Sequence, residues 1–207
     1  LIKAVPNIPW IRLMYAFPGY ISDNLIDLMA TEPQILPYLD LPLQHADPKI
    51  LRSMKRPSDM SAVQNMLLRM RESIPNLTLR TTLIVGYSGE DEQSFQKLVD
   101  FIKAVEFDHL GTFSYSFEPG SPAEPLGDPI PQWIKEKRQE RIMEIQSEIS
   151  LKRNQHFIGK TLDILVEGVD QENFISIGRS FRDAPEIDGL VFVEGLAPIG
   201  ELVPVKI

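Results

Sequence analysis

The chain has 207 residues and no cysteine, which excludes disulfides and thiolate metal sites within these residues and makes the cytoplasm the expected compartment. Its net charge of −8 argues against a general nucleic-acid binder. No run approaches the roughly 20 apolar residues that span a membrane. The opening residues, "LIKAVPNIPW", have no initiator Met and no signal-peptide pattern, so we expect a piece of a longer chain.

Short apolar runs alternate with helical patterns in the first part of the chain. "WIRLMYAF" (10–17) and "YLDLPL" (38–43) are predicted strands, and between them Ser22 is a predicted N-cap for the helix "DNLIDLMA". After the second strand, Asp47 and the proline that follows it predict the start of a short helix. A longer helix is predicted over about 59–73, where apolar residues recur at helical spacing.

Two further strands are predicted at 78–86 and 109–117, with an amphipathic helix between them at about 91–105. The resulting order is β-α-β-α-β-α-β. Strands that are joined by helices are parallel and their crossovers are right-handed, so the pattern predicts a parallel barrel or an open sheet.

The pattern changes after this region. The segment "EPGSPAEPLGDPIP" contains five prolines and is followed by a long charged helix at about 131–154. Beyond Gly159 the chain consists of short β-rich runs separated by turn residues, which is typical of a small barrel. We therefore divide the chain into an α/β part (1–129), a helical linker (130–158) and a small all-β domain (159–207).

Polar residues occur where the predicted parallel strands end, which is where sites gather in such folds. The second strand ends in Gln44 and His45. The third carries Arg80 and continues into "VGYSGE", and the fourth is followed by Glu118. Each also fits a structural role: a capped histidine, an arginine paired with a carboxylate, glycines in a turn. Taken together, they predict a ligand site on one face.

Four blocks of sequence resemble a known family. "YLDLPLQHADPKILRSMKR", "LRTTLIVGYSGEDEQSF", "FDHLGTFSYSFEPGSPA" and "GRSFRDAPEIDGLVFVE" occur in this order. Together they resemble the methylthiotransferases of the radical S-adenosylmethionine (radical SAM) superfamily. The last block resembles the RimO type, which modifies an aspartate of a small-subunit ribosomal protein. The resemblance covers nearly the whole chain.

The resemblance implies the fold and the cofactors. We expect the last four strands of a partial (βα) barrel of radical SAM type, a helical linker, and an OB-like TRAM barrel. S-adenosylmethionine and 4Fe–4S clusters are the implied cofactors, with the cluster cysteines outside these residues, so that the chain alone is expected to be inactive. Two positions depart from the family: Ser88 stands where Pro is usual, and Pro57 where Gly is usual.

The resemblance also implies roles for the residues at the strand ends. Gln44 and His45 would face S-adenosylmethionine, and Arg80 would bind its methionyl carboxylate, for which a guanidinium is suited. Val85 and Gly86 would pack on the adenine, and Glu118 would complete the cofactor-binding set. The implied chemistry is radical formation from S-adenosylmethionine, hydrogen abstraction from a carbon, and placement of a methylthio group there. No residue of this chain is expected to ligate a metal.

A surface of the last domain is a candidate for substrate docking. Residues 160–207 contain nine acidic and four basic residues, a net charge of −5, which suits a basic ribosomal protein better than a polyanion. Asp183, Glu186 and Asp188 are expected to point outward from a turn and to contribute to this contact.

Three alternatives remain open. The nearest is a tRNA adenosine methylthiotransferase, which would favour a basic TRAM domain. A second is a non-catalytic OB-like RNA-binding module, which needs aromatic platforms on a basic groove, whereas the domain offers only Phe174, Phe181 and Phe192. The third is a metal-dependent hydrolase that uses Asp40, His45 and Glu118.

Overall fold

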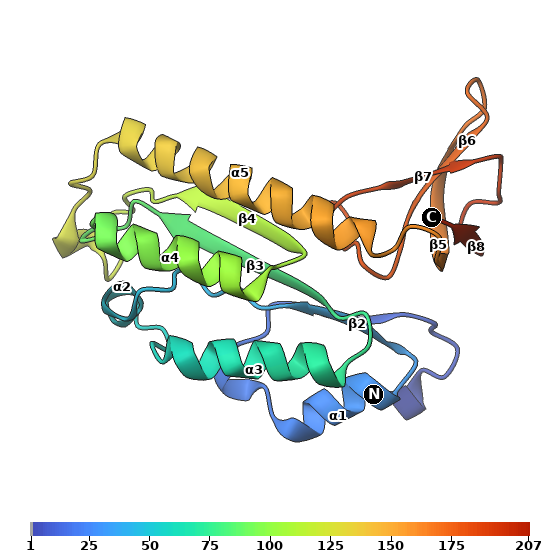
Figure 1. Cartoon of the computed structure of the whole chain (residues 1–207), viewed down its shortest axis with the longest axis horizontal. Helices are drawn as coiled ribbons and strands as arrows, with labels where there is room; N and C mark the ends of the chain where they lie inside the picture. The colour runs from blue at the N-terminus through green and yellow to red at the C-terminus, as the bar shows by residue number, and fades with distance from the viewer. Residues whose placement is uncertain (1) are drawn as a thin grey trace.

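The structure is a computed structural model that describes residues 2–207, and it contains two four-stranded sheets (Figure 1). The parallel sheet has the order β1-β2-β3-β4 and the other has the order β7-β6-β5-β8. The elements of the first sheet and its helices are β1 (Ile11–Leu13), α1 (Asp23–Thr31), β2 (Ile35–Asp40), α2 (Pro48–Ser53), α3 (Met60–Ser73), β3 (Thr78–Val85), α4 (Glu92–Val105) and β4 (His109–Ser114). Single 3-10 turns lie at Ile2–Ala4, Pro18–Tyr20 and Glu124–Leu126.

The helices begin where local capping predicts them to begin. The Ser22 side chain accepts a hydrogen bond from the Leu25 N–H at the start of α1. The Asp47 carboxylate accepts from Lys49 and Ile50 at the start of α2, and Asp59 and Asp91 cap α3 and α4 in the same way. Each cap satisfies donors that a first helical turn leaves free. The caps therefore confirm the predicted helix starts, and the observed order of elements is the predicted alternation of strands and helices.

The main hydrophobic core lies between the parallel sheet and its helices. The apolar stripes of α3 and α4 are buried against alternate residues of β3, such as Leu79 and Leu83, whose exposure is zero. Three residues that alternate with these, Arg80, Thr82 and Ile84, lie on the opposite face of the sheet and are only partly covered. One face of the sheet is therefore sealed by helices, and the other face is open to form a site.

The long helix α5 (Gln132–Gln155) lies along β4 and α4 and joins the two sheets (Figure 1). It buries Ile142, Ile145 and Ile149 in the main core. The polar side chains of Lys135, Arg138 and Gln146 are also buried in the same interface. α5 therefore carries polar anchors as well as an apolar stripe.

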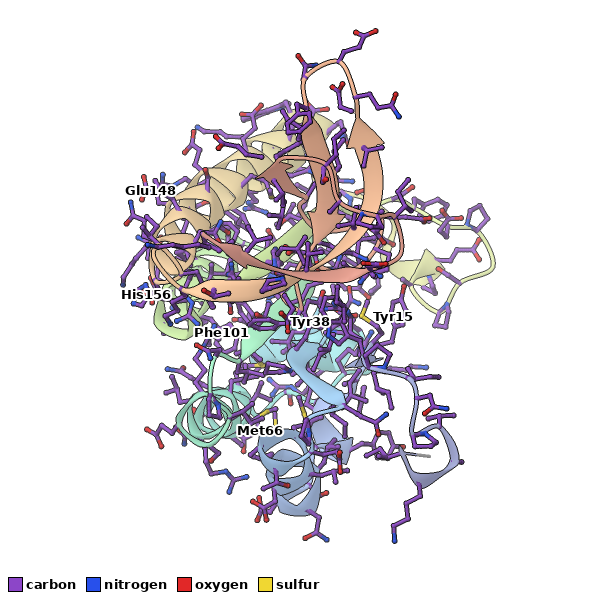
Figure 2. The ribbon with its side chains drawn as sticks, turned by 90° about the vertical axis from the view of Figure 1, so that its right-hand side faces the viewer. Tyr15, Tyr38, Met66, Phe101, Glu148 and His156 are labelled. Atoms are coloured by element: carbon purple, nitrogen blue, oxygen red, sulfur yellow. The ribbon has the colours of Figure 1, made fainter. Side chains whose placement is uncertain are left out.

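The C-terminal sheet is antiparallel and strongly curled, as expected for a small β-barrel domain (Figure 2). It consists of β5 (Thr161–Asp170), β6 (Ile175–Arg179), β7 (Val191–Glu194) and β8 (Leu202–Lys206). The loop between β6 and β7 reaches back to the parallel sheet, where Ala184 packs against Leu36 and Tyr38. Among residues 2–207, no helix has the length and apolar character needed to cross a bilayer.

Candidate functional site

Two cavities open at the C-terminal edge and the open face of the parallel sheet. The mouth cavity, about 400 Å³, lies above the strand ends, and its lining includes Gln44, Arg56, Ile84, Tyr87 and Tyr115. The face cavity, about 480 Å³, lies on the open face of the parallel sheet. Its lining includes Gln44, Arg56, Arg80, Thr82, Phe113 and Ile187. Gln44 and Arg56 belong to both linings, so the two cavities adjoin each other.

Gln44 reaches these cavities because the chain after β2 stops behaving as a regular strand. Pro42 has no N–H to donate to the ladder, and Gln44 adopts a left-handed conformation with φ of 74°. Gln44 nevertheless stays attached to β3, because its N–H donates to the Thr82 carbonyl and its own carbonyl accepts from Ile84. The predicted placement of Gln44 at a site is thus supported by the position of its side chain between the two cavities.

His45 points the other way, so the expectation that it faces a ligand is wrong. Its side chain is fully buried, and its Nδ1 accepts a hydrogen bond from the Asp47 N–H at 2.9 Å. The Nε2 atom lies 3.3 Å from Glu90 Oε2 without the alignment of a hydrogen bond. His45 is therefore a structural residue that shapes the turn from β2 into α2.

Glu90, the last residue of "VGYSGE", holds three elements together from a fully buried position. Its Oε2 accepts a hydrogen bond from the Gly86 N–H at 2.9 Å, and its Oε1 accepts from Arg138 of α5 at 2.8 Å. His45 lies against the same carboxylate. The glutamate of this motif thus fixes the loop after β3 against α5 and the end of β2, a role that was missed in the sequence.

Val85 and Gly86 also lie on the helix side of the sheet. Val85 is fully buried in the main core and lines neither cavity, so the packing of Val85 and Gly86 on the adenine stays a prediction. Gly86 has a φ of 76°, and a Cβ added there would lie 2.3 Å from Lys135 Cγ of α5. Only glycine allows α5 to approach this closely. The ammonium of Lys135 in turn donates to the Tyr115 carbonyl at 2.8 Å, which ties the end of β4 to the same helix.

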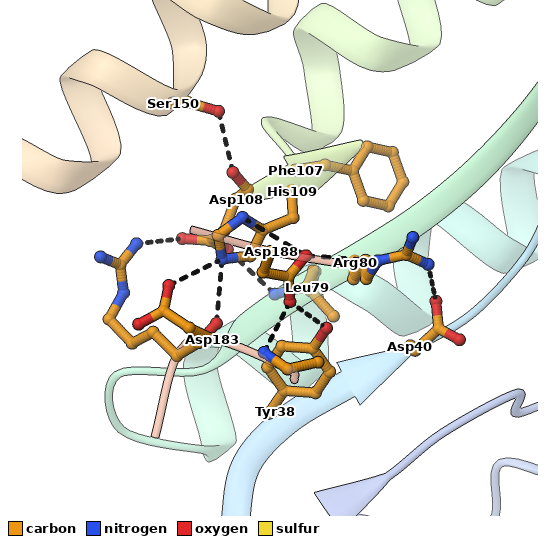
Figure 3. Close-up of polar contacts among 12 residues, drawn as sticks. Tyr38, Asp40, Leu79, Arg80, Phe107, Asp108, His109, Ser150, Asp183 and Asp188 are labelled. Carbon is orange, nitrogen blue, oxygen red and sulfur yellow. Dashed lines mark hydrogen bonds and ion pairs between the residues drawn. The ribbon is translucent and has the colours of Figure 1, made fainter. Parts of the chain in front are cut away.

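Arg80 is already paired with two carboxylates of the chain, so the expectation that it is available to a cofactor carboxylate at the mouth is wrong (Figure 3). Its Nη1 donates to Asp40 at 2.9 Å, and its Nε lies 3.3 Å from Asp188. Burial alone lowers the pKa of Arg80, but these two carboxylates outweigh it and raise the pKa. Arg80 is also the third of eight residues in β3, so it lies well before the strand's C-terminal end.

The loop between β6 and β7 is turned inward rather than outward, which corrects the docking prediction for two of its three acidic residues. Asp188 is inserted beside Arg80, accepts from the Tyr38 hydroxyl at 2.6 Å, and has a side chain only 2% exposed (Figure 3). Asp183 is buried and accepts from the N–H and hydroxyl of Ser180. Only Glu186 points to solvent. Asp188 turns inward because the face of the parallel sheet supplies a cation, Arg80, and a donor, Tyr38, whereas Asp183 is satisfied within its own loop.

A further buried carboxylate, that of Asp108, joins the two parts of the molecule. It lies 3.0 Å from Arg71 of α3, 3.0 Å from Arg153 of α5 and 3.5 Å from Arg182 of the C-terminal domain. Burial by itself raises the pKa of Asp108, but Arg71 and Arg153 outweigh it and lower the pKa. Burial likewise raises the pKa of Tyr38, with help from its hydrogen bond to Asp188. These groups keep the domains in register.

Glu118 lies apart from the other predicted residues, in the exposed segment after β4.

Arg56 is a candidate site residue that the sequence analysis did not single out. It lines both cavities, its guanidinium lies 5.7 Å from the ring of Phe17, and it makes no ion pair within residues 2–207. The feature of the sequence that could have indicated Arg56 is "MKR", which places two basic residues directly after the short helix α2.

Across the described part of the chain, no group of three or more His, Asp or Glu residues is placed to hold a metal ion.

Family models match both parts of the chain. Residues 1–102 match the radical SAM superfamily, and residues 158–207 match the TRAM domain. A solved structure, coproporphyrinogen III oxidase (HemN) from Escherichia coli, described as a radical SAM enzyme, superimposes with a TM-score of 0.55 at 17% identity. This superposition covers 68% of this chain and 32% of that one, and it supports the predicted partial barrel at the level of the fold.

Curated relatives are similar over the whole chain. A protein of Chloroflexus aurantiacus is 46% identical over 210 residues, and one of Microcystis aeruginosa is 47% identical over 201 residues. A relative from Thermus thermophilus is 46% identical over 200 residues. All three are named ribosomal protein uS12 methylthiotransferase RimO. The chain covers 46% of the length of each, so it spans about half of the relatives that it matches.

Proposed function

The chain belongs to the RimO-type methylthiotransferases of the radical SAM superfamily, and we propose that the protein it belongs to places a methylthio group on an aspartate of ribosomal protein uS12. We assign residues 1–129 to the C-terminal part of the radical SAM barrel, 130–158 to the linker and 159–207 to the TRAM domain. The structural observation that carries the proposal is the pair of adjoining cavities at the C-terminal edge of the parallel sheet, which share Gln44 and Arg56.

The mouth cavity fits S-adenosylmethionine in size and in chemistry. Its wall combines apolar surface from Ile84 with the rings of Tyr87 and Tyr115, which suits a flat adenine. The Tyr115 hydroxyl is buried and has no hydrogen-bond partner in the described part of the chain. Burial raises the pKa of Tyr115, so this hydroxyl stays protonated and can donate a hydrogen bond to a ligand.

The residues of the mouth cavity have separate tasks in this proposal. Gln44 can orient the ligand with its amide, because its backbone is fixed to β3 on both sides. Arg56 replaces Arg80 as the cation for the methionyl carboxylate, since Arg80 is already paired with Asp40 and Asp188. When bound, S-adenosylmethionine supplies the radical chemistry, while the protein supplies position and excludes water.

The iron–sulfur ligands must come from outside these residues. Clusters of this kind are held by cysteine thiolates, and this chain contains no cysteine. What this chain would contribute is part of the wall of the S-adenosylmethionine site: the ends of β2, β3 and β4 and the loops that follow them. We place the protein in the cytoplasm, where a ribosomal protein would be modified.

The proposal is tested with the complete enzyme that contains this chain. After anaerobic cluster reconstitution, it is incubated with S-adenosylmethionine, a reductant, a sulfur source and purified uS12. Mass spectrometry should find one methylthio group on an aspartate of uS12. Formation of methylthioadenosine in tRNA, with uS12 unmodified, would refute the proposal in favour of the tRNA-modifying branch.

A binding test isolates the role of Arg56. Arg56→Ala should weaken S-adenosylmethionine binding by about 2–5 kcal/mol, the typical cost of truncating one partner of a buried charge pair. Arg52→Ala is the matched control, because Arg52 is a nearby exposed arginine that lines neither cavity. Equal affinities of wild type and Arg56→Ala in a titration would remove Arg56 from the cofactor site.

A further inference from the structure

The face cavity has a wall that comes from the other domain. Its lining comes from the segments around β1, β2, β3 and β4, and from Ile187 in the loop between β6 and β7. Ile187 is the only lining residue of this cavity that comes from beyond residue 129. The TRAM domain therefore contributes one wall to the face cavity on the open face of the parallel sheet.

The loop that carries Ile187 is clamped in place from both sides. Asp188, the next residue, is held by Arg80 at 3.3 Å and by the Tyr38 hydroxyl at 2.6 Å. Arg12 donates to the carbonyls of Phe181 at 2.8 Å and Asp183 at 2.9 Å. These contacts are charge-assisted and partly buried, so they hold the backbone on either side of Ile187.

Ile187 itself is left half-exposed, although its neighbours are locked. Ile187 is 47% exposed as a residue, and it lines the same cavity as Thr82 of β3 and Phe113 of β4. Phe113 is 60% exposed. A large apolar side chain on a rigid loop beside an open cavity is suited to contact whatever enters that cavity. The adjacent Asp188 and Arg80 are paired with each other, and Arg80 is also paired with Asp40. Arg56, the other charged lining residue, is shared with the mouth cavity, so Ile187 offers a ligand shape rather than charge.

We infer that the loop 183–189 of the TRAM domain forms the floor of the substrate chamber, and that Ile187 is a specificity-determining residue that limits how deeply the target side chain enters. This inference rests on the proposed function and assigns the "DAPEIDG" block a place inside the reaction chamber instead of a docking role on the surface. A floor at this depth favours a short side chain, such as that of aspartate, close to the mouth cavity.

The experiment uses the complete reconstituted enzyme and measures the ratio of methylthiolated uS12 to 5′-deoxyadenosine. Ile187→Trp places a larger side chain at the floor of the substrate chamber, where it should displace the target side chain. A misplacement of about 1 Å can cost about 100-fold in rate, so this ratio should fall by a factor of that order. Ile187→Val keeps an apolar side chain of similar size at this position. Its ratio of methylthiolated uS12 to 5′-deoxyadenosine should therefore stay close to that of the wild type.

Ile199→Trp is the matched control, because Ile199 is 62% exposed in the same domain and lines none of the cavities described above. It should leave the ratio unchanged. The inference is overturned if Ile187→Trp modifies uS12 with the wild-type ratio, or if Ile199→Trp lowers the ratio equally. Failure of the proposed function has a different signature, since the wild-type enzyme would then leave uS12 unmodified.

Discussion

The removal of the buried carboxylate of Glu90 should destabilise the chain strongly. This side chain is fully buried, pairs with Arg138 at 2.8 Å and accepts from the Gly86 N–H at 2.9 Å. Glu90→Ala leaves the guanidinium of Arg138 without its buried partner, which typically costs about 3–5 kcal/mol. Glu90→Gln keeps the shape and one accepting oxygen but loses a charge-assisted hydrogen bond, worth about 1.5–3 kcal/mol.

Urea denaturation followed by circular dichroism measures both losses as a shift of the midpoint at constant slope. Glu92→Ala is the matched control, because Glu92 lies 3.8 Å from the same guanidinium with a side chain that is 85% exposed. This surface change should stay within about 0.5 kcal/mol of wild type. Adding Arg138→Ala to Glu90→Ala removes the unpaired cation, so the double variant should lose less than the sum of the single losses.

Two results would refute this reasoning. One is a loss below about 1 kcal/mol for Glu90→Ala, which is the range of an exposed pair. The other is an equal loss for Glu92→Ala, which would mean that burial does not distinguish the two carboxylates. Either result would also leave the fixed position of the Gly86 turn without its explanation.

Three further predictions follow from particular contacts. Gly86→Ala should cost more stability in urea than Gly89→Ala, because both have positive φ but only the Cβ at Gly86 would collide with α5; equal losses would contradict this. The stability difference between wild type and Asp108→Asn should be full at about pH 7 and should shrink as the pH falls through the lowered pKa of Asp108, because this carboxylate stabilises the fold only while ionised; a difference that persists at about pH 2 would count against the arginine pairing. The isolated chain should release no 5′-deoxyadenosine after iron–sulfur reconstitution, since it has no cysteine to hold a cluster, and detection of that product by chromatography would show otherwise.

The elements and the family were accessible from the sequence because they depend on local patterns. Apolar periodicity located the helices and strands, and the capping residues Ser22 and Asp47 marked helix starts that the structure confirms. Alternation of strands with helices required a parallel sheet, and the β-rich end required a separate antiparallel one. Gln44 lines both cavities, and its position at the end of a parallel strand is one where topology alone predicts a site.

The direction of the polar side chains was decided only by the tertiary structure. His45 follows Gln44 directly, yet it turns inward to Glu90, and Asp188 meets Tyr38 across 150 residues of sequence. The sequence alone does not indicate whether an arginine or an aspartate faces solvent, a ligand or a buried partner. The choice depends on which opposite charge the fold brings within about 4 Å, because burying a charge is favourable only when it is paired. For Asp188 of the "DAPEIDG" loop, the partners Arg80 and Tyr38 came from the other domain.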